Sequence, residues 1–600
     1  MSTVGETLDA NQRRSAKEQR GFYLRHLHER LRDTIDVDLY SPPEAIDAAL
    51  TQLSEELSAM ADTIVLYRQR RNALLPVSRL LPNILVRVFA SLAHDDPPCT
   101  APWSSPLHEK IWEALGWIKV TQVCAAWRHL ALTTPSLWNR IHNVVSPRWA
   151  IALLERSAPE PIIWRVKIRQ HEASALDAAA DALGTTHVQR LARLTVEFPS
   201  AHVPQGRLVK LLSSAPRLEE LTISDASGGR TLPLSTNDVV LPLLRRLTLN
   251  HTLPPFWDIS ILHGLTHLEL NLRNPTTELP PPRRPTLVQL LHILRACPQL
   301  ASLVLTHILR AADMGPCPPE YTRAPLALPH LARLALTGDA AEHTALLAAL
   351  RTAPARIALR SGNAGAGPML AAHRAALACW LAPAPPRPLR ALHLGLQRYG
   401  NAAGARFVLS ASTSASESES ALTPTPAEPP RERELDLTVA GAHDAHSWRV
   451  LLADSWRAVL TATLARLPPG MLQSLTLDGP LLSLLGVEGF RALILSPGVA
   501  GISELRLLYG ADLPAAFPGL LDDVGEGTGN VLLPALGVLE LLGAEMENPR
   551  VGMVLLEYIK RRRERGVPGL VRLVMRRCVG AAEWAERLRE LVEDVRVVKE

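Results

Sequence analysis

The chain has 600 residues, of which 47% are hydrophobic and 20% are charged, and its formal net charge is +5. This composition is typical of a globular protein with a sizeable core, and so small a net charge gives no reason to expect a nucleic-acid partner. The six cysteines are scattered and form no C-x-x-C pair, which argues against a zinc site or a disulfide framework and favours a reducing compartment.

No uninterrupted apolar run approaches the roughly 20 residues that a membrane-spanning helix needs. The N-terminal stretch carries charges but lacks the apolar centre of a secretory signal. We therefore expect an intracellular protein, in the cytoplasm, the nucleus or both, with no membrane partner.

Two segments precede the first compact domain. Residues 1–40 are polar and are expected to be a loosely ordered extension. Residues 41–75 predict an amphipathic helix that begins near Pro42-Pro43-Glu44. Its apolar residues alternate at spacings of four and three, which is a heptad seam: Ile46, Leu50, Leu53, Leu57, Met60, Ile64 and Tyr67. Such a seam predicts either a helix packed on the next domain or a short coiled coil with a partner.

Residues 76–140 predict a small, mostly helical domain with an unusual density of tryptophan. Pro82 can open a first helix, and a second amphipathic stretch includes Val123 and Trp127. The sequence TTPSLW closes the domain at Trp138.

From residue 145 to residue 600 the pattern L-x-x-L-x-L recurs at intervals of roughly 20 to 35 residues. Many copies follow an amphipathic helical stretch and a proline, so the repeating unit is a helix, a stop and a short strand. Stacked units predict an irregular solenoid, with parallel strands on the concave side and helices on the convex side. The register of the pattern is poor between residues 337 and 471. There, residues 410–434 are rich in serine, proline and charge and predict a disordered insertion.

In L-x-x-L-x-L the leucines point inward and the intervening residues point outward, because side chains alternate along a strand. The candidate target-binding residues on the concave face are therefore Glu220, Thr222, Arg246, Thr248, His267, Glu269, Glu504, Arg506, Arg572 and Arg576. Their mixed charge indicates no single class of ligand, although the arginines near the C-terminal end would suit an acidic peptide.

No enzymatic motif is found. The glycine-rich Gly525–Asn530 lacks the Lys-Ser/Thr pair of a phosphate loop, and the histidine pairs at 26–28 and 443–446 lack metalloprotease spacing. The basic run Lys560–Arg565 suits the solvent face and C-terminal turn of a helix better than a nuclear signal. We expect no catalysis, no cofactor and no metal.

The segment from Leu80 to Trp138 resembles an F-box, whose pattern is a Leu-Pro opening, an apolar helix, V-C-x-x-W and a later L-W. With the repeats, the chain is similar to F-box proteins with a C-terminal leucine-rich-repeat-like array, of the type abundant in mushroom-forming fungi. The resemblance implies an α + α/β fold and a set of adaptor-binding residues: Leu80, Pro82, Ile84, Leu85, Val88, Phe89, Val123, Cys124, Trp127, Leu137 and Trp138.

The resemblance also implies a non-catalytic role in an SCF-type (Skp–cullin–F-box) ubiquitin ligase. The F-box would bind a Skp-type adaptor and through it a cullin, while the repeats would hold a target protein of unknown identity. The alternative is a leucine-rich-repeat scaffold for protein interactions that assembles no ligase.

Overall fold

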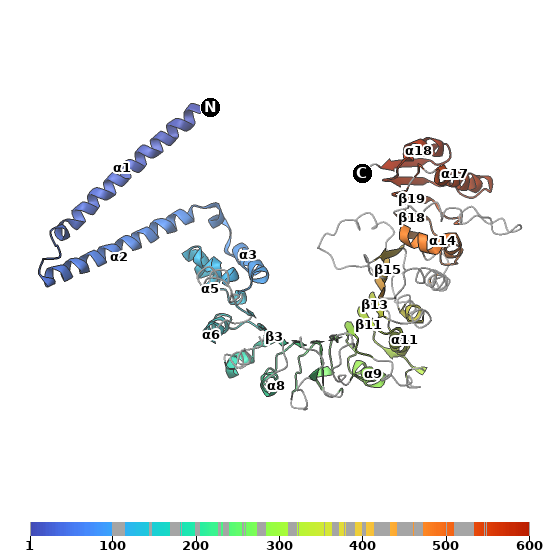
Figure 1. Cartoon of the computed structure of the whole chain (residues 1–600), viewed down its shortest axis with the longest axis horizontal. Helices are drawn as coiled ribbons and strands as arrows, with labels where there is room; N and C mark the ends of the chain where they lie inside the picture. The colour runs from blue at the N-terminus through green and yellow to red at the C-terminus, as the bar shows by residue number, and fades with distance from the viewer. Residues whose placement is uncertain are drawn as a thin grey trace. The chain divides into compact units, whose positions relative to one another are not determined.

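The chain divides into two compact units, Met1–Trp138 and Asn139–Glu600, in a computed structural model (Figure 1). The structure describes residues 2–98, 115–142, 147–167, 181 and 183–598, without the gaps within the last range at 199–204, 226–229, 232–238, 255–256, 258–259, 273–283, 310–320, 322, 353, 363–370, 377–378, 380–390, 399–403, 413–432, 441–459, 461–471, 500, 509–532, 545 and 548.

The first unit begins with two long helices, α1 (Ser2–Ile35) and α2 (Pro43–Ala73). The expectation of a loosely ordered extension is wrong for α1, because its Arg, Lys, Glu, Gln and Leu residues are all good helix formers. Helix α2 begins at Pro43, as the proline and acidic residue at its first turn predict. The helices contact each other through the hydroxyls of Tyr23 and Tyr67, 2.9 Å apart, and an ion pair between Arg30 and Glu56.

Short helical segments make up the rest of the described part of the first unit. They are η1 (Pro76–Arg79), α3 (Pro82–Asp95), η2 (Gly116–Gln122), α5 (Ala125–Leu132) and η3 (Pro135–Leu137). Proline occupies the first turn of η1, α3 and η3, where its missing N–H costs no hydrogen bond.

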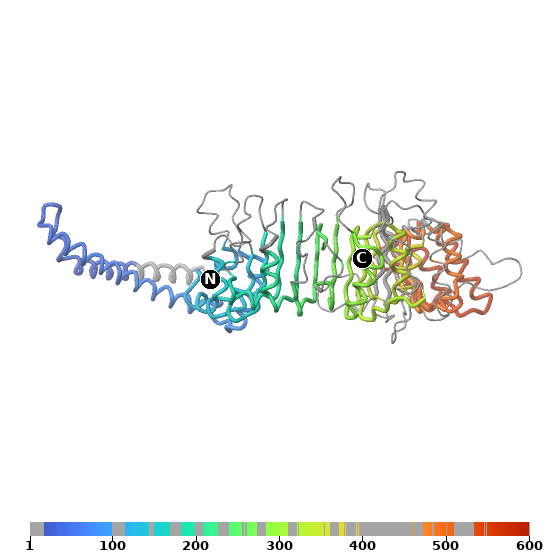
Figure 2. The backbone as a smooth tube through the Cα atoms, turned by 90° about the horizontal axis from the view of Figure 1, so that it is seen from below, coloured from blue at the N-terminus to red at the C-terminus, as the bar shows by residue number. Residues whose placement is uncertain are grey.

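The second unit is built on a 17-stranded sheet in which all pairings except those of β15 are parallel. Figure 2 shows neighbouring strands of this sheet as side-by-side runs of the backbone. Its strands are β1 (Arg140–His142), β2 (Ile162–Lys167), β3 (Leu191–Phe198), β4 (Glu220–Asp225), β6 (Arg246–Asn250), β8 (His267–Asn271), β9 (Ser302–Thr306), β11 (Arg333–Gly338), β13 (Arg356–Gly362), β14 (Ala391–Arg398), β15 (Gly404–Ser412), β16 (Arg433–Ala440), β17 (Ser474–Asp478), β18 (Glu504–Leu508), β19 (Val538–Leu542), β20 (Arg572–Arg576) and β21 (Asp594–Val598). Two small parallel pairs join β5 (Arg230–Thr231) to β7 (Thr252–Leu253) and β10 (Leu326–Ala327) to β12 (Leu350–Arg351).

The helices α8, α9 and α11 lie on one side of this sheet (Figure 1). The helical segments of the unit whose bounds are described include α6 (Pro147–Arg156), α8 (Gln205–Ser213), η4 (Ser260–Leu262), α9 (Leu287–Arg295), α11 (Ala340–Ala349), α14 (Gly479–Ile494), α17 (Pro549–Glu564) and α18 (Ala581–Arg589). We refer to the other side of the sheet, on which the residues between the leucines lie, as the open face.

A ladder of leucines forms the core between sheet and helices. Leu221, Leu247, Leu268, Leu303 and Leu334 occupy the same register on successive strands, and each is almost fully buried. Burying one such side chain contributes about 1.5–3 kcal/mol. A single strand has no partner for its leucines, so stability depends on stacking.

The unit around α9 shows how sequence dictates this arrangement. Thr286 and Gln289 cap the helix N-terminus reciprocally, and Leu287, Leu290 and Leu294 form its buried face. The helix ends at Arg295 shortly before Pro298, and β9 begins four residues after that proline.

The middle of the sheet departs from the predicted succession of parallel strands. Strand β13 pairs with β16, β16 and β14 both pair antiparallel with β15, and β14 pairs with β17. The predicted insertion at 410–434 is too long at both ends, because β15 extends to Ser412 and β16 begins at Arg433. Residues 413–432 lie outside the described part. The run Phe407–Leu409 is apolar and β-prone enough for a strand, and an antiparallel pair needs no crossover helix.

A close contact between α17 and α18 leads to a first prediction. A Cβ atom on Gly552 would come within 2.2 Å of two atoms of the Trp584 indole, whose Nε1 donates to the Met546 carbonyl at 3.0 Å. Glycine to alanine in a helix ordinarily stabilises by up to about 1 kcal/mol. Here we expect Gly552→Ala to lower the free energy of unfolding by about 1–3 kcal/mol, because the ring must move.

The measurement is the midpoint of thermal unfolding, with Gly21→Ala in α1 as the matched control. A Cβ at residue 21 meets no atom within 4 Å, so that change should be neutral or stabilising. A midpoint for Gly552→Ala equal to that of the control would contradict the packing account.

Candidate protein-interaction surfaces

Four of the predicted adaptor-binding residues form the core of the first unit. Each of them is at most 8% exposed: Leu85, Phe89, Leu137 and Trp138. They therefore stabilise the domain, and only exposed residues beside them can contact another protein. Trp138 donates from Nε1 to the carbonyl of Ala131 at 2.7 Å.

The tryptophans of this region pack against one another and against Phe89. The ring of Phe89 meets Trp127 edge-on at 5.2 Å, and the rings of Trp117 and Trp138 are 4.8 Å apart. Large aromatic rings supply much of the apolar area that so small a domain can bury.

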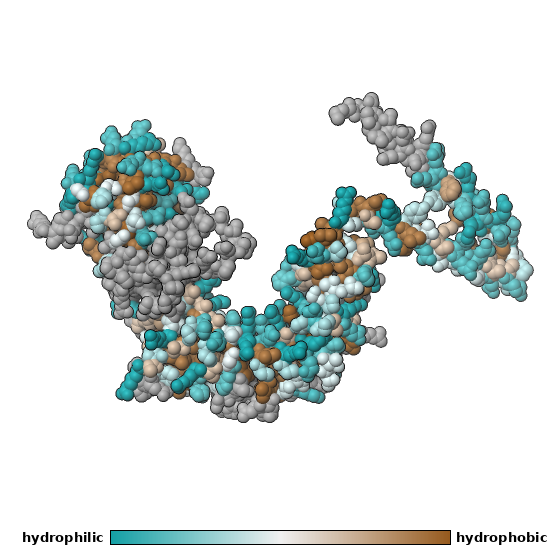
Figure 3. Space-filling view, turned by 180° about the vertical axis from the view of Figure 1, so that it is seen from behind, coloured by the Kyte–Doolittle hydropathy of each residue, from teal (hydrophilic) through white to brown (hydrophobic). Residues whose placement is uncertain are grey.

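The other predicted residues reach the surface. Leu80, Pro82, Ile84, Val88 and Val123 are exposed, while Cys124 and Trp127 are half-buried. The motif missed two further exposed residues, Leu81 and Leu92. Helical periodicity places both beside Ile84 and Val88. We refer to Leu81, Ile84, Val88 and Leu92 as the α3 strip, and Figure 3 shows apolar side chains gathered on this unit.

The predicted second amphipathic helix is broken in the middle. A 3₁₀ segment ends at Gln122, and α5 starts only at Ala125. Cys124 is the N-cap of α5, and its sulfur accepts from the backbone N–H of Trp127 at 3.5 Å. The Val123-Cys124 pair is therefore a helix boundary, and Val123 lies exposed before the helix rather than along a continuous helix face.

On the open face, all ten predicted target-binding residues lie at strand positions that alternate with the buried leucines. Arg246 and Arg572 are exposed, and the other eight are half-buried: Glu220, Thr222, Thr248, His267, Glu269, Glu504, Arg506 and Arg576. Neighbouring residues of this face touch across strands, because parallel strands lie about 4.8 Å apart.

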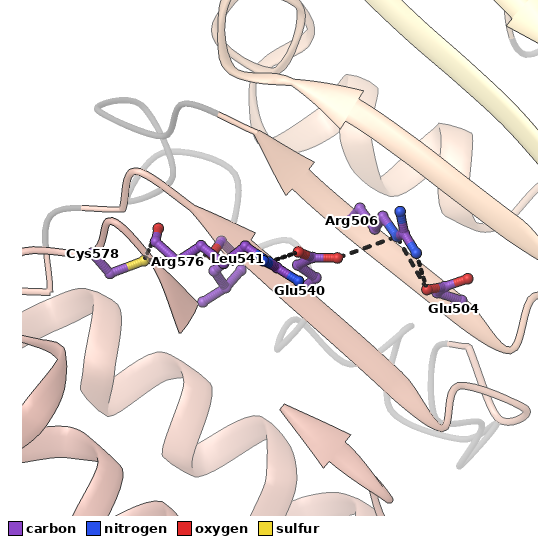
Figure 4. A network of polar contacts seen from close by, with 6 residues as sticks. All are labelled: Glu504, Arg506, Glu540, Leu541, Arg576 and Cys578. Atoms are coloured by element: carbon purple, nitrogen blue, oxygen red, sulfur yellow. Dashed lines mark hydrogen bonds and ion pairs between the residues drawn. The ribbon is translucent and has the colours of Figure 1, made fainter. Parts of the chain in front are cut away.

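Near the C-terminus the arginines of the open face are already ion-paired (Figure 4). Arg506 contacts Glu504 at 2.7 Å and Glu540 at 3.2 Å, and Arg576 contacts the other oxygen of Glu540 at 2.6 Å. Sequence reasoning missed Glu540, although it occupies an intervening position of its repeat and the alternation could have found it.

A second cluster lies on the last two strands. Arg572 and Arg596 donate to Asp594 at 2.9 and 3.0 Å. Their hydrogen bonds, that of Arg596 foremost, lower the pKa of the Asp594 carboxyl. Strand β21 has valines where the repeat pattern expects leucines, so no leucine signal marked it.

At the other end of the sheet, Glu220 lies between Arg193 and Arg246, at 3.4 and 3.5 Å. Arg246 faces His267 on the next strand. Partial burial and, secondly, the charge of Arg246 lower the pKa of this imidazole, which favours its neutral form. The charged side chains of these clusters on the open face therefore pair with one another. The arginines near the C-terminus are consequently less available to an acidic peptide than the sequence alone indicates.

The basic run Lys560–Arg565 does not lie wholly on the solvent face, as expected from sequence. Arg562 is fully buried, and its guanidinium donates to the carbonyls of Leu533, Leu536 and Pro568 at 2.6–2.9 Å. Only the neighbouring basic residues can meet solvent.

Within the described residues, no helix is both long and apolar enough to cross a membrane. In the same part of the chain, no three His, Cys, Asp or Glu side chains are grouped so as to hold a metal ion. Comparison of the whole sequence with protein-family models and with curated proteins finds no match.

Proposed function

We propose that this chain is a non-catalytic substrate-recognition subunit of an SCF-type ubiquitin ligase. In this proposal residues 76–140 form an F-box domain that binds a Skp-type adaptor and through it a cullin. The observation that carries the proposal is the α3 strip with Val123: exposed apolar side chains in the same small domain whose core includes Phe89 and Trp138. Contiguous exposed apolar surface on a small domain marks a protein-interaction site.

The second unit serves in this proposal as an irregular leucine-rich-repeat solenoid that holds a target protein on its concave, open face. Support comes from the strands in the same register with their leucines buried on the helix side, and from the polar residues on the other side. The contribution to ubiquitin transfer is proximity, which raises the effective concentration of target lysines near a separate conjugating enzyme.

A charged substitution in the α3 strip tests adaptor binding. We expect Val88→Asp to abolish capture of a purified Skp-type adaptor by the full chain, because burying an unpaired carboxylate at an apolar contact is costly. The matched control is Ala90→Asp, which places the same side chain at an exposed position of the same helix, about 200° away around its axis. Its capture should equal that of the unmodified chain.

One outcome would contradict the ligase proposal, and another would contradict the assignment of the contact to the α3 strip. Failure of the unmodified chain to capture adaptor leaves the scaffold alternative, in which the open face binds proteins without ligase assembly. Equal loss of capture in both variants would place the contact elsewhere on α3. Circular dichroism of each variant shows whether the helices are retained.

A further inference from the structure

Helix α2 presents an apolar seam that is mostly exposed in the described part of the chain. The three residues Leu50, Leu57 and Ile64 follow one another every seven positions and are 57%, 68% and 49% exposed. Helix α1 contacts α2 at Glu56, beside the seam, and at the hydroxyl of the seam residue Tyr67, whose side chain is still 62% exposed. Surface helices seldom keep a heptad row of large apolar residues in water, so we expect another helix to pack against this row.

The charges of α2 are separated along its length. Residues 43–62 contain five acidic side chains and no basic one, whereas residues 63–73 contain three arginines and no acidic one. A second α2 helix lying antiparallel, centred between Ser58 and Ala59, would set residues 63–73 with their three arginines against residues 44–54, whose only charged residues are Glu44 and Asp47. A parallel one would set like charges together, which is unfavourable.

The seam is also symmetric about the point between Ser58 and Ala59. In heptad notation Leu50, Leu57 and Ile64 are a residues, and Leu53, Met60 and Tyr67 are d residues. Antiparallel coiled coils pair a with d, and here the layers Leu50–Tyr67, Leu53–Ile64 and Leu57–Met60 all have the same centre. A two-fold axis through that point therefore forms each of these three layers twice, as an isologous interface requires.

We propose that α2 is a homodimerisation helix, which pairs antiparallel with α2 of a second copy of this chain. The same two-fold axis brings Asp47 of one copy beside Arg68 of the other, at equivalent e positions on both ends of the seam. Both side chains are exposed. The two Asp47–Arg68 contacts distinguish this pairing from a parallel one, in which e residues face g residues and these two would meet Pro42 and Thr63.

Sedimentation velocity of the full chain over a range of concentrations tests the proposal through charge reversal. We expect the unmodified chain to dimerise, and Asp47→Arg or Arg68→Asp alone to raise the dimer dissociation constant by about tenfold, because two attractive contacts become repulsive. The double variant Asp47→Arg with Arg68→Asp should regain the original constant, and so should an equimolar mixture of the two single variants. The matched control Asp62→Arg, on the opposite side of the helix, should change nothing.

A monomeric unmodified chain would overturn the proposal. So would a dimer that is indifferent to both single reversals, or one that the double variant fails to restore. The reversals replace exposed side chains, so the helices should be retained, and circular dichroism verifies this. Adaptor capture by Asp47→Arg should equal that of the unmodified chain, since the seam is separate from the α3 strip.

Discussion

Replacing Arg562 by alanine will destabilise the C-terminal end of the second unit by about 3–5 kcal/mol, because several buried carbonyls would lose a charged hydrogen-bond donor. Arg562 is fully buried at the C-terminal end of α17. Its two terminal nitrogens donate to the carbonyls of Leu533, Leu536 and Pro568 and to the hydroxyl of Tyr558. One side chain thus joins α17 to the segments that lead into β19 and β20.

The size of this effect follows from what remains after the substitution. Several backbone carbonyls would lose their donor while still buried, and each unsatisfied buried group costs about 1–3 kcal/mol. Arg562→Lys will recover only part of the loss, because a single ammonium cannot reach all the acceptors that the planar guanidinium reaches.

The adjacent residue provides a matched control. Arg561 is 40% exposed and pairs with Glu557 one helical turn away, at 3.0 Å. Such a surface pair contributes no more than about 0.5 kcal/mol, so Arg561→Ala should be close to neutral. Thermal unfolding followed by circular dichroism compares the two. Equal midpoints would mean that the buried hydrogen bonds of Arg562 do not hold this region together.

The repeating part of the fold could be predicted from sequence because its pattern is local. Each L-x-x-L-x-L supplies a strand with period two, and Leu221 and Leu247 then align because successive strands bury equivalent leucines. The same alternation places Glu220 and Arg246 on the open face. Local rules of this kind need no knowledge of the rest of the chain.

The features that could not be predicted from sequence depend on contacts between segments far apart in the chain. The exchange of order among β14, β15 and β16 follows from pairings that no single stretch encodes, and the antiparallel β15 has no leucine signature. The burial of Arg562 depends on carbonyls 26–29 residues earlier in the chain. The predicted set of adaptor-binding residues likewise included both Phe89 and Val88, although Phe89 lies in the core and Val88 lies on the surface.

Acidification from pH 7 to pH 5 will weaken the region around α11, because two buried histidines there resist protonation. His343 on α11 and His373 in the helix at 371–376 are at most 2% exposed. Burial, and next the charge of His307, lower the pKa of His343 to about 4. Burial, and next the charge of His343, lower that of His373 to about 3.

The sign of this pH effect follows from the difference in proton binding between the folded and the unfolded chain. Above pH 6.5 both histidines are neutral in the folded and the unfolded chain, so they add no pH dependence. Below pH 6.5 the unfolded chain binds protons that the folded chain does not, and the free energy of unfolding falls by about 1.4 kcal/mol per pH unit for each histidine. The loss ends only when the pH reaches the folded-state pKa values. Between pH 7 and pH 5 each histidine should therefore remove about 2 kcal/mol.

Hydrogen exchange of the β11 and α11 amides, corrected for the intrinsic rate at each pH, measures this loss locally. His343→Gln should reduce the difference in opening free energy between pH 7 and pH 5 by about 2 kcal/mol, whatever constant cost the substitution adds. His330→Gln, at an exposed position in the same repeat, is the matched control and should leave the pH difference unchanged. Should His343→Gln keep the full pH difference, the acid sensitivity of this region would have to come from other groups, since a glutamine at that position cannot bind the proton.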